Sequence, residues 1–162
     1  MRRVVLGVDP GSRHTGFGVL KGDGEELQHL ASGHISAGSR PPLENRLRRI
    51  FDGLTALIRE HRPQSLALEE IFLAGSVQAA LTLGQVRGVV LLAAAQAGLP
   101  VFQYAPLVVK KAVVGYGLAS KSQVQLMVEH LVGRKVSSQH AADALAVGLC
   151  HLFHSRRPDF PK

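Results

Sequence analysis

The chain has 162 residues, of which 46% are hydrophobic and 19% charged, a composition that indicates a folded globular protein and excludes an extensively disordered one. Its single cysteine, Cys150, excludes a disulfide framework and a cysteine-based zinc site within one chain, so we expect a reducing, cytoplasmic setting. The length predicts a single domain, residues 1–162.

Positive charge is concentrated toward the C-terminus. The net charge is +7, and residues 100–162, with 8 Lys or Arg against 3 Asp or Glu, carry +5 of it. A basic region attracts polyanions such as nucleic acid, although the same charge could serve only to keep the protein in solution. Charge alone leaves both interpretations open.

No segment is expected to enter a membrane. The longest apolar run, Val89–Ala95, falls well short of the roughly 20 residues that cross a bilayer. The apolar run at the N-terminus stops at Asp9, Pro10 and Gly11, too early for a signal peptide. We therefore expect a protein that is neither membrane-bound nor secreted.

Three strands open the predicted fold. The run VVLGVD at 4–9 is β-branched and stops at Pro-Gly, which indicates a buried strand followed by a turn. The next two strands are expected at 15–20 and around 25–37, with the tract KGDGEE supplying the hairpin turn between them.

Helices and strands alternate in the rest of the chain. Apolar spacings, glycine and proline stops and serine caps place these elements. They are a helix at 43–61, a strand at 65–72, a helix at 77–97, a strand at 101–104, a turn or short helix at 110–114, and helices that begin after Ser120 and Ser138. The order predicts an α/β fold, a mixed five-stranded sheet with helices on both faces.

The predicted helix at 77–97 contains GVVLLAAAQAG, which is apolar on nearly every side. Such a helix is buried on more sides than a surface helix is. Burial in the monomer core explains the pattern. A homodimer interface is the alternative, because closed two-fold contacts are the commonest way to cover a second apolar face.

Three acidic side chains occur in apolar surroundings. Asp9 ends the strand VVLGV, Glu69 follows LAL, and Asp143 lies in an alanine-rich helix. In α/β sheets, ligands bind at the carboxyl ends of strands, which is where Asp9 and Glu69 are expected.

The alternation of side chains along a strand distinguishes Glu69 from its neighbour Glu70. Residues two apart share a face, so Asp9 lies beside Gly7 and Glu69 beside Ala67. These small neighbours leave room for an ion. Because Glu70 follows two leucines on its own face, we expect Glu69 to be the inward acid.

His140 and Asp143 are three residues apart and therefore share one face of their helix. Two or three carboxylates that meet in a partly buried place repel each other unless a proton or a cation intervenes. Oxygen ligands of this kind suit Mg²⁺ or Mn²⁺. The alternative is three unrelated structural acids: one in a turn, one paired with arginine, and one favoured by the helix dipole.

Five segments occur in a characteristic order and spacing across residues 3–154. They are LGVDPGSRHTGFGV, LALEEIFLA, LTLGQVRGV, VVKKAVVGYGLASKSQVQLMV and HAADALAVG. Together they resemble the RuvC family of bacterial Holliday junction resolvases. The resemblance implies a ribonuclease H-like fold and a homodimer that cuts two symmetric strands of a four-way DNA junction. It further implies Mg²⁺ or Mn²⁺, with two ions in each active site, and cooperation with the RuvA-RuvB branch-migration complex.

The same resemblance places the catalytic and metal-binding positions at Asp9, Glu69, His140 and Asp143. In a two-metal site, one ion activates water and the other stabilises the leaving oxygen. Asp9 is then expected to bridge the two ions, while Glu69 and Asp143 hold one each. His140, a position that is Asp or His in the family, is expected to bind a metal or to orient the attacking water.

The resemblance also implies contacts with DNA phosphates or bases. Arg87, Lys110 and Lys121 match basic positions of the family, and Phe72 matches an aromatic residue that stacks on bases. Lys111 adds charge nearby, as do Arg134 and Lys135. Solvated helix ends and a core phenylalanine are the alternative interpretations. Gly75-Ser76 departs from the Lys-Asn that family members often have there, so the preferred cut sequence stays open.

Three other functions fit parts of the sequence. A ribonuclease H-like nuclease could act on RNA or an RNA–DNA hybrid, because the acids alone do not name the substrate. An actin-like nucleotide-binding protein would cradle phosphate in residues 9–12, but the sequence has one such loop where that class has paired loops. A non-catalytic DNA-binding scaffold is the third, and it would lose nothing when Asp9 is replaced.

Overall fold

The computed structural model describes residues 2–23, 25–71 and 75–156. Its five strands form one sheet in the order β3-β2-β1-β4-β5. The strands are β1 (Arg3–Asp9), β2 (His14–Gly22), β3 (Leu27–Ser36), β4 (Ser65–Glu69) and β5 (Val101–Tyr104). The first three are antiparallel, whereas β4 is parallel to both β1 and β5. The predicted mixed five-stranded sheet is therefore confirmed.

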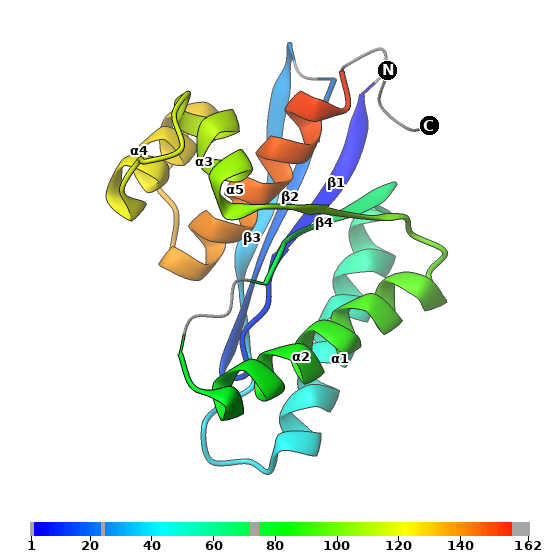
Figure 1. Ribbon diagram of the computed structural model, residues 1–162. Coiled ribbons are helices and arrows are strands. Elements are labelled where there is room, and N and C mark those ends of the chain that lie inside the picture. The colour runs from blue at the N-terminus through cyan, green and yellow to red at the C-terminus, as the bar shows by residue number, and fades with distance from the viewer. Residues whose placement is uncertain (1, 24, 72–74, 157–162) are drawn as a thin grey trace.

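Helices cover both faces of this sheet, as expected. They are α1 (Leu43–His61), α2 (Val77–Gln96), α3 (Pro106–Val114), α4 (Lys121–Val132) and α5 (Gln139–His154). Figure 1 shows α1 and α2 against one face and the other three helices on the opposite face. Two hydrophobic cores result, one beneath α1 and α2 and one beneath α3, α4 and α5.

Local sequence signals explain most helix ends. Ser76, Ser120 and Ser138 cap α2, α4 and α5 by accepting backbone N–H hydrogen bonds from the first turn. The prediction for α3 was too short, because the helix already begins at Pro106. Proline is favoured at the first helical position, where its missing N–H has no partner to lose.

Helix α5 lies directly on the backbone of β1 and β2. A Cβ atom built at Gly7 would stand 2.0 Å from the carbonyl oxygen of Ala144, and one at Gly16 would stand 2.1 Å from that of His140. The strand glycines and helix alanines therefore leave no side chain between the two backbones. This contact brings the start of α5 to the carboxyl end of β1.

The close contact of α5 with the sheet predicts different effects for two glycine substitutions, one on β1 and one on α5. Gly7→Ala is expected to lower the free energy of unfolding by about 2–3 kcal/mol, since backbone atoms would have to move apart. Gly148→Ala on α5 meets mainly Leu20 Cδ1 at 3.2 Å. Its gain of about 1 kcal/mol in helix propensity should leave stability nearly unchanged. Urea unfolding measures both, and equal losses would contradict the close-contact explanation.

Candidate active site

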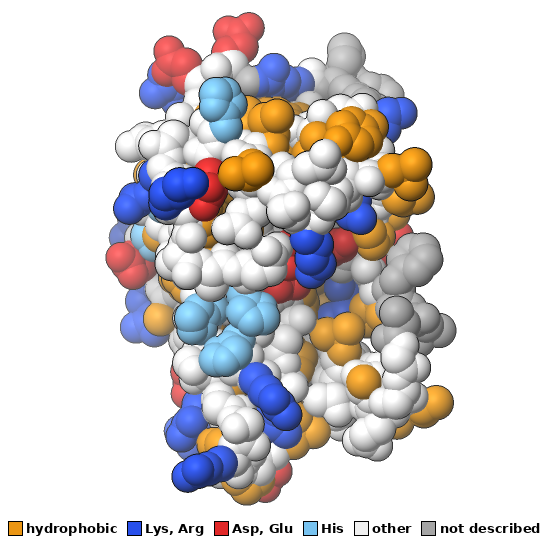
Figure 2. All heavy atoms as spheres, turned by 90° about the vertical axis from the view of Figure 1, so that its left-hand side faces the viewer, with side chains coloured by type: hydrophobic (Ala, Val, Ile, Leu, Met, Phe, Trp, Pro, Cys, Tyr) orange, Lys and Arg blue, Asp and Glu red, His pale blue; other side chains and the backbone are white. Residues whose placement is uncertain are grey.

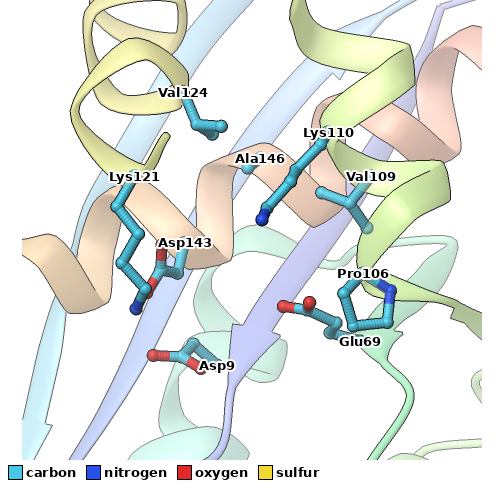
Figure 3. A pocket seen from close by; sticks show the side chains of 9 residues that line it. All are labelled: Asp9, Glu69, Pro106, Val109, Lys110, Lys121, Val124, Asp143 and Ala146. Carbon is cyan, nitrogen blue, oxygen red and sulfur yellow. The ribbon is translucent and has the colours of Figure 1, made fainter. Parts of the chain in front are cut away.

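Acidic residues from three elements line one cavity of about 290 Å³. Asp9 ends β1, Glu69 ends β4, and Asp143 lies in the first half of α5. Because β1 and β4 are parallel neighbours, their carboxyl ends meet at the same edge of the sheet. Figure 3 shows the three carboxylates around one opening, with Lys110 and Lys121 reaching toward them from α3 and α4.

Asp9 is the most electrostatically perturbed of these acids. Burial raises the pKa of its carboxyl to about 6, and the charge of Asp143 adds to the effect. His140 and Lys121 act in the opposite direction, and Nδ1 of His140 lies 3.5 Å from Oδ2 of Asp9. The side chain of Asp9 is 28% exposed, so the carboxylate is partly desolvated while one side stays open to the cavity.

Glu69 shares this environment. Burial raises the pKa of its carboxyl, and the neighbouring charges of Asp143 and Asp9 raise it further. Asp143 thus disfavours the ionisation of both Asp9 and Glu69, and Asp9 disfavours that of Glu69. A bound cation would offset this repulsion, so the acids are placed as a cation site requires.

Asp143 is held by two side chains. Nζ of Lys121 lies 3.5 Å from its Oδ2, and Nε2 of Gln139 donates a hydrogen bond of 2.8 Å to its Oδ1. Gln139 was not among the residues singled out in the sequence. Its position four residues before Asp143 on a helix could have indicated the contact.

The donor set fits Mg²⁺ or Mn²⁺, because carboxylate oxygens are the ligands these cations prefer. Within the ranges that the structure describes, no three His, Cys, Asp or Glu side chains are close enough to hold one ion as they stand. The carboxylates line one cavity rather than meet at a point. Binding an ion would need them to turn inward.

The basic residues singled out in the sequence occupy different environments. Lys110 and Lys121 line the acidic cavity, whereas Lys111 is exposed on α3. Arg87, which the resemblance leads us to expect in contact with DNA, is buried. Its guanidinium donates to the carbonyl oxygen of Glu69 at 2.6 Å and to Oε1 of Gln103 at 2.5 Å. Phe72 lies outside the described residues.

Two histidines that the sequence did not single out lie close to His140. The rings of His14 and His34, from β2 and β3, are 5.4 and 6.2 Å from the His140 ring, centroid to centroid. No local spacing connects these residues, because they come from three separate elements.

Known proteins resemble this chain over nearly all of its length. A family model described as crossover junction endodeoxyribonuclease RuvC matches residues 5–151. Proteins with that name from Geobacter metallireducens and Parvibaculum lavamentivorans are 48% and 51% identical to it. The alignments cover 91% and 90% of this chain and 90% and 84% of the relatives.

Solved structures agree in fold. Thermus thermophilus RuvC in complex with a Holliday junction substrate matches with a TM-score of 0.89 and 37% identity, over 95% of each chain. The yeast mitochondrial Holliday junction resolvase, at 12% identity and a TM-score of 0.66 over 94% of this chain and 81% of its own, shares the fold.

The fold and its relatives define the chain as a ribonuclease H-like nuclease. The relatives share more than the fold. The family model matches residues 5–151, and the two curated relatives are about half identical in sequence to this chain. The chain belongs to the RuvC family of crossover junction endodeoxyribonucleases. The family and the fold expected from the five sequence segments are thereby confirmed.

The raised pKa of Asp9 predicts a pH-dependent gain in stability for Asp9→Asn. Without divalent cations at pH 7.5, the variant should be more stable by about 1–2 kcal/mol, because the partly buried charge is removed. The folded wild type binds a proton more tightly than the unfolded chain, so its own stability rises as the pH falls through about 6.

The advantage of Asp9→Asn should therefore disappear by about pH 4, near the ordinary pKa of an aspartate. Urea unfolding in EDTA at several pH values measures it. Asp52→Asn, an exposed residue of α1, is the control. An advantage of the same size at pH 4 and pH 7.5 would contradict the electrostatic explanation.

Proposed function

We propose that the protein is a metal-dependent endonuclease that resolves four-way DNA junctions by paired, symmetric strand cuts during recombination and repair. The observation that carries the proposal is the group of acids at the adjoining ends of β1 and β4 and on α5. Membership of the RuvC family names the substrate class, since a junction is what the similar Thermus protein is bound to.

The acids at the cavity are proposed to hold Mg²⁺ or Mn²⁺, two ions in each site. When bound, such ions activate a water and stabilise the leaving 3′-oxygen. Asp9 is the proposed shared ligand, because it ends β1, which pairs with the strand that carries Glu69 and lies against the helix that carries Asp143. His140 supplies a ring nitrogen beside Asp9, as a ligand or as a group that orients water.

Lysines beside the acids are proposed to contact the phosphates of the DNA. Lys110 and Lys121 line the cavity itself, so each could neutralise a phosphate close to the reacting bond. Lys121 is 3.5 Å from Asp143 before any DNA is bound. Lys111 adds charge on the exposed side of α3, and Phe72 remains the proposed stacking residue.

A homodimer is proposed to form through α2. Residues three or four apart on its outer side make an exposed stripe: Val77, Leu81, Gly84, Gly88, Leu91 and Leu92. The two central residues are glycines, and a Cβ atom at either would have no neighbour within 4 Å. Because the centre of the stripe has no side chains, two such helices could approach each other closely there. Two-fold pairing would then remove the apolar stripes of both copies from water.

By length and composition alone, α2 could also cross a membrane, and only 28% of its apolar window is buried in the fold. We favour a second copy as the partner, because the inner side of α2 carries Arg87, hydrogen-bonded to the sheet. A helix packed in this way exposes only one side, whereas a membrane-spanning helix would need apolar surface on all sides. We further propose a single domain that acts in the cytoplasm and works with RuvA-RuvB.

The proposed function predicts cutting of a mobile four-way junction only when Mg²⁺ or Mn²⁺ is present. EDTA should abolish cutting and leave binding intact, and Asp9→Asn should lower the cleavage rate by about 1,000-fold while junction affinity stays within about 3-fold. Native gels measure binding, and denaturing gels map the paired nicks.

Asp52→Asn, exposed on α1, is the matched control and should cut normally. Equal cutting of an RNA–DNA hybrid or a linear duplex would contradict junction selectivity. If the wild type bound the junction but did not cut it in the presence of metal, the result would support the non-catalytic DNA-binding scaffold instead.

The proposed dimer predicts that charges in the α2 stripe uncouple the two cuts. Leu81→Glu combined with Leu92→Glu should weaken dimerisation at least about 100-fold, because carboxylates would be buried at the interface. Analytical ultracentrifugation should then give the 17.4 kDa monomer. A plasmid that extrudes a cruciform should be nicked rather than linearised.

Leu126→Glu, an exposed leucine on α4, is the control for the dimer test and should remain dimeric. A double variant of α2 that stays dimeric would exclude this stripe as the interface.

A further inference from the structure

Three histidine rings form a cluster beside the candidate active site. The centroids of His14 and His34 are 4.9 Å apart in an edge-to-face arrangement, and His140 lies 5.4 and 6.2 Å from them. Figure 2 shows histidine side chains gathered on one face, next to acidic and basic side chains. The proposed function assigns a role to His140 alone.

The register of the sheet explains why these rings meet. Asp9 pairs with Gly16 on β2, and Gly16 pairs with His34 on β3, so the three occupy one row across the sheet. His14 lies two residues before Gly16 and therefore on the same face. Since Gly16 has no side chain, the backbone of His140 lies directly over it, and the His140 ring lies among those of the two strand histidines.

The contact between His140 and Asp9 does not by itself fix the His140 ring. The two side chains are 3.5 Å apart, at the outer limit of a hydrogen bond, and His140 is 44% exposed. An aromatic ring is held more firmly by neighbouring rings at centroid distances of about 4.5–7 Å. His14 and His34 supply such neighbours on one side of His140, and Asp9 lies on another.

The burial of His14 has a free-energy cost, which favours a role for this ring in packing. Its Nδ1 is buried and has no hydrogen-bond partner among the described residues, which disfavours folding. Desolvation and the neighbouring charges of His34 and His140 lower the pKa of His14. The ring of His14 lies 5.4 Å from that of His140, and this ring contact is what the buried position of His14 provides.

We propose that His14 and His34 are positioning residues that pack against the imidazole of His140 and hold it beside Asp9. The inference rests on the proposed role of His140 in the nuclease site. A group that must present one nitrogen to a metal or a water acts better when its ring cannot turn away. The two strand histidines touch neither metal nor substrate in this role and act only through His140.

The first experiment measures the His140 ring without metal or DNA. Long-range ¹H–¹⁵N correlation spectra of the full chain in EDTA should show one dominant tautomer for His140 in the wild type. His14→Ala and His34→Ala should move the ring nitrogens toward averaged shifts. His14→Phe, which keeps an aromatic ring, should restore most of the wild-type pattern, and His130→Val on α4 is the control.

The second experiment tests whether the effect passes through His140. With a four-way junction and Mg²⁺, His14→Ala is expected to lower kcat about 5–10-fold in the wild type and less than 2-fold in a His140→Asp background. Junction affinity in EDTA should stay within 2-fold.

Three outcomes would overturn the inference. They are unchanged His140 shifts in both alanine variants, an equal loss of kcat in the two backgrounds, and a loss of affinity in EDTA that matches the loss of rate. The last would make the histidines DNA contacts. A wild type that never cuts would refute the proposed nuclease instead, and the spectra would still decide whether the strand histidines hold the ring.

Discussion

The direct contact between the backbone of α5 and those of β1 and β2 is the constraint on which the rest of the structure depends. It requires glycine at Gly7 and Gly16, where a Cβ atom would collide with helix carbonyls. It also requires small residues on the facing side of α5, which the sequence supplies as alanines. A larger side chain in this layer would push α5 outward and carry Asp143 away from the end of β1.

Bringing the acids together has an electrostatic consequence. Burial raises the pKa of both Asp9 and Glu69, and each acid lies near enough to another to raise it further. The fold tolerates this repulsion because the hydrophobic cores on the two sides of the sheet hold β1, β4 and α5 in place. Gathering these acids lowers stability, and Lys121 offsets only part of the charge.

Features that local sequence patterns determine, such as strand ends and helix caps, could be predicted from the sequence. Contacts that depend on strand register, or on which side of a helix faces the sheet, could not. The end of β1, the whole of α1 and the cap of α5 are set by local patterns, so Asp9 and Asp143 could be placed before the fold was known. His14 and His34 join His140 only through strand pairing that no local spacing encodes. Arg87 was expected to contact DNA, but α2 is apolar on nearly every side, so periodicity could not show that this arginine faces the sheet.

The two sides of α2 connect the proposed dimer to the chemistry. Its outer stripe would pair with a second copy, while Arg87 on its inner side donates to the carbonyl oxygen of Glu69, the last residue of β4. The helix that would set the distance between two active sites thus also contacts the strand that carries one of the acids. Two-fold pairing through a helix bonded in this way would place two identical cavities at a fixed separation, which a loop-mediated contact could not do. A four-way junction has two equivalent strands to cut, and a fixed pair of sites suits that symmetry.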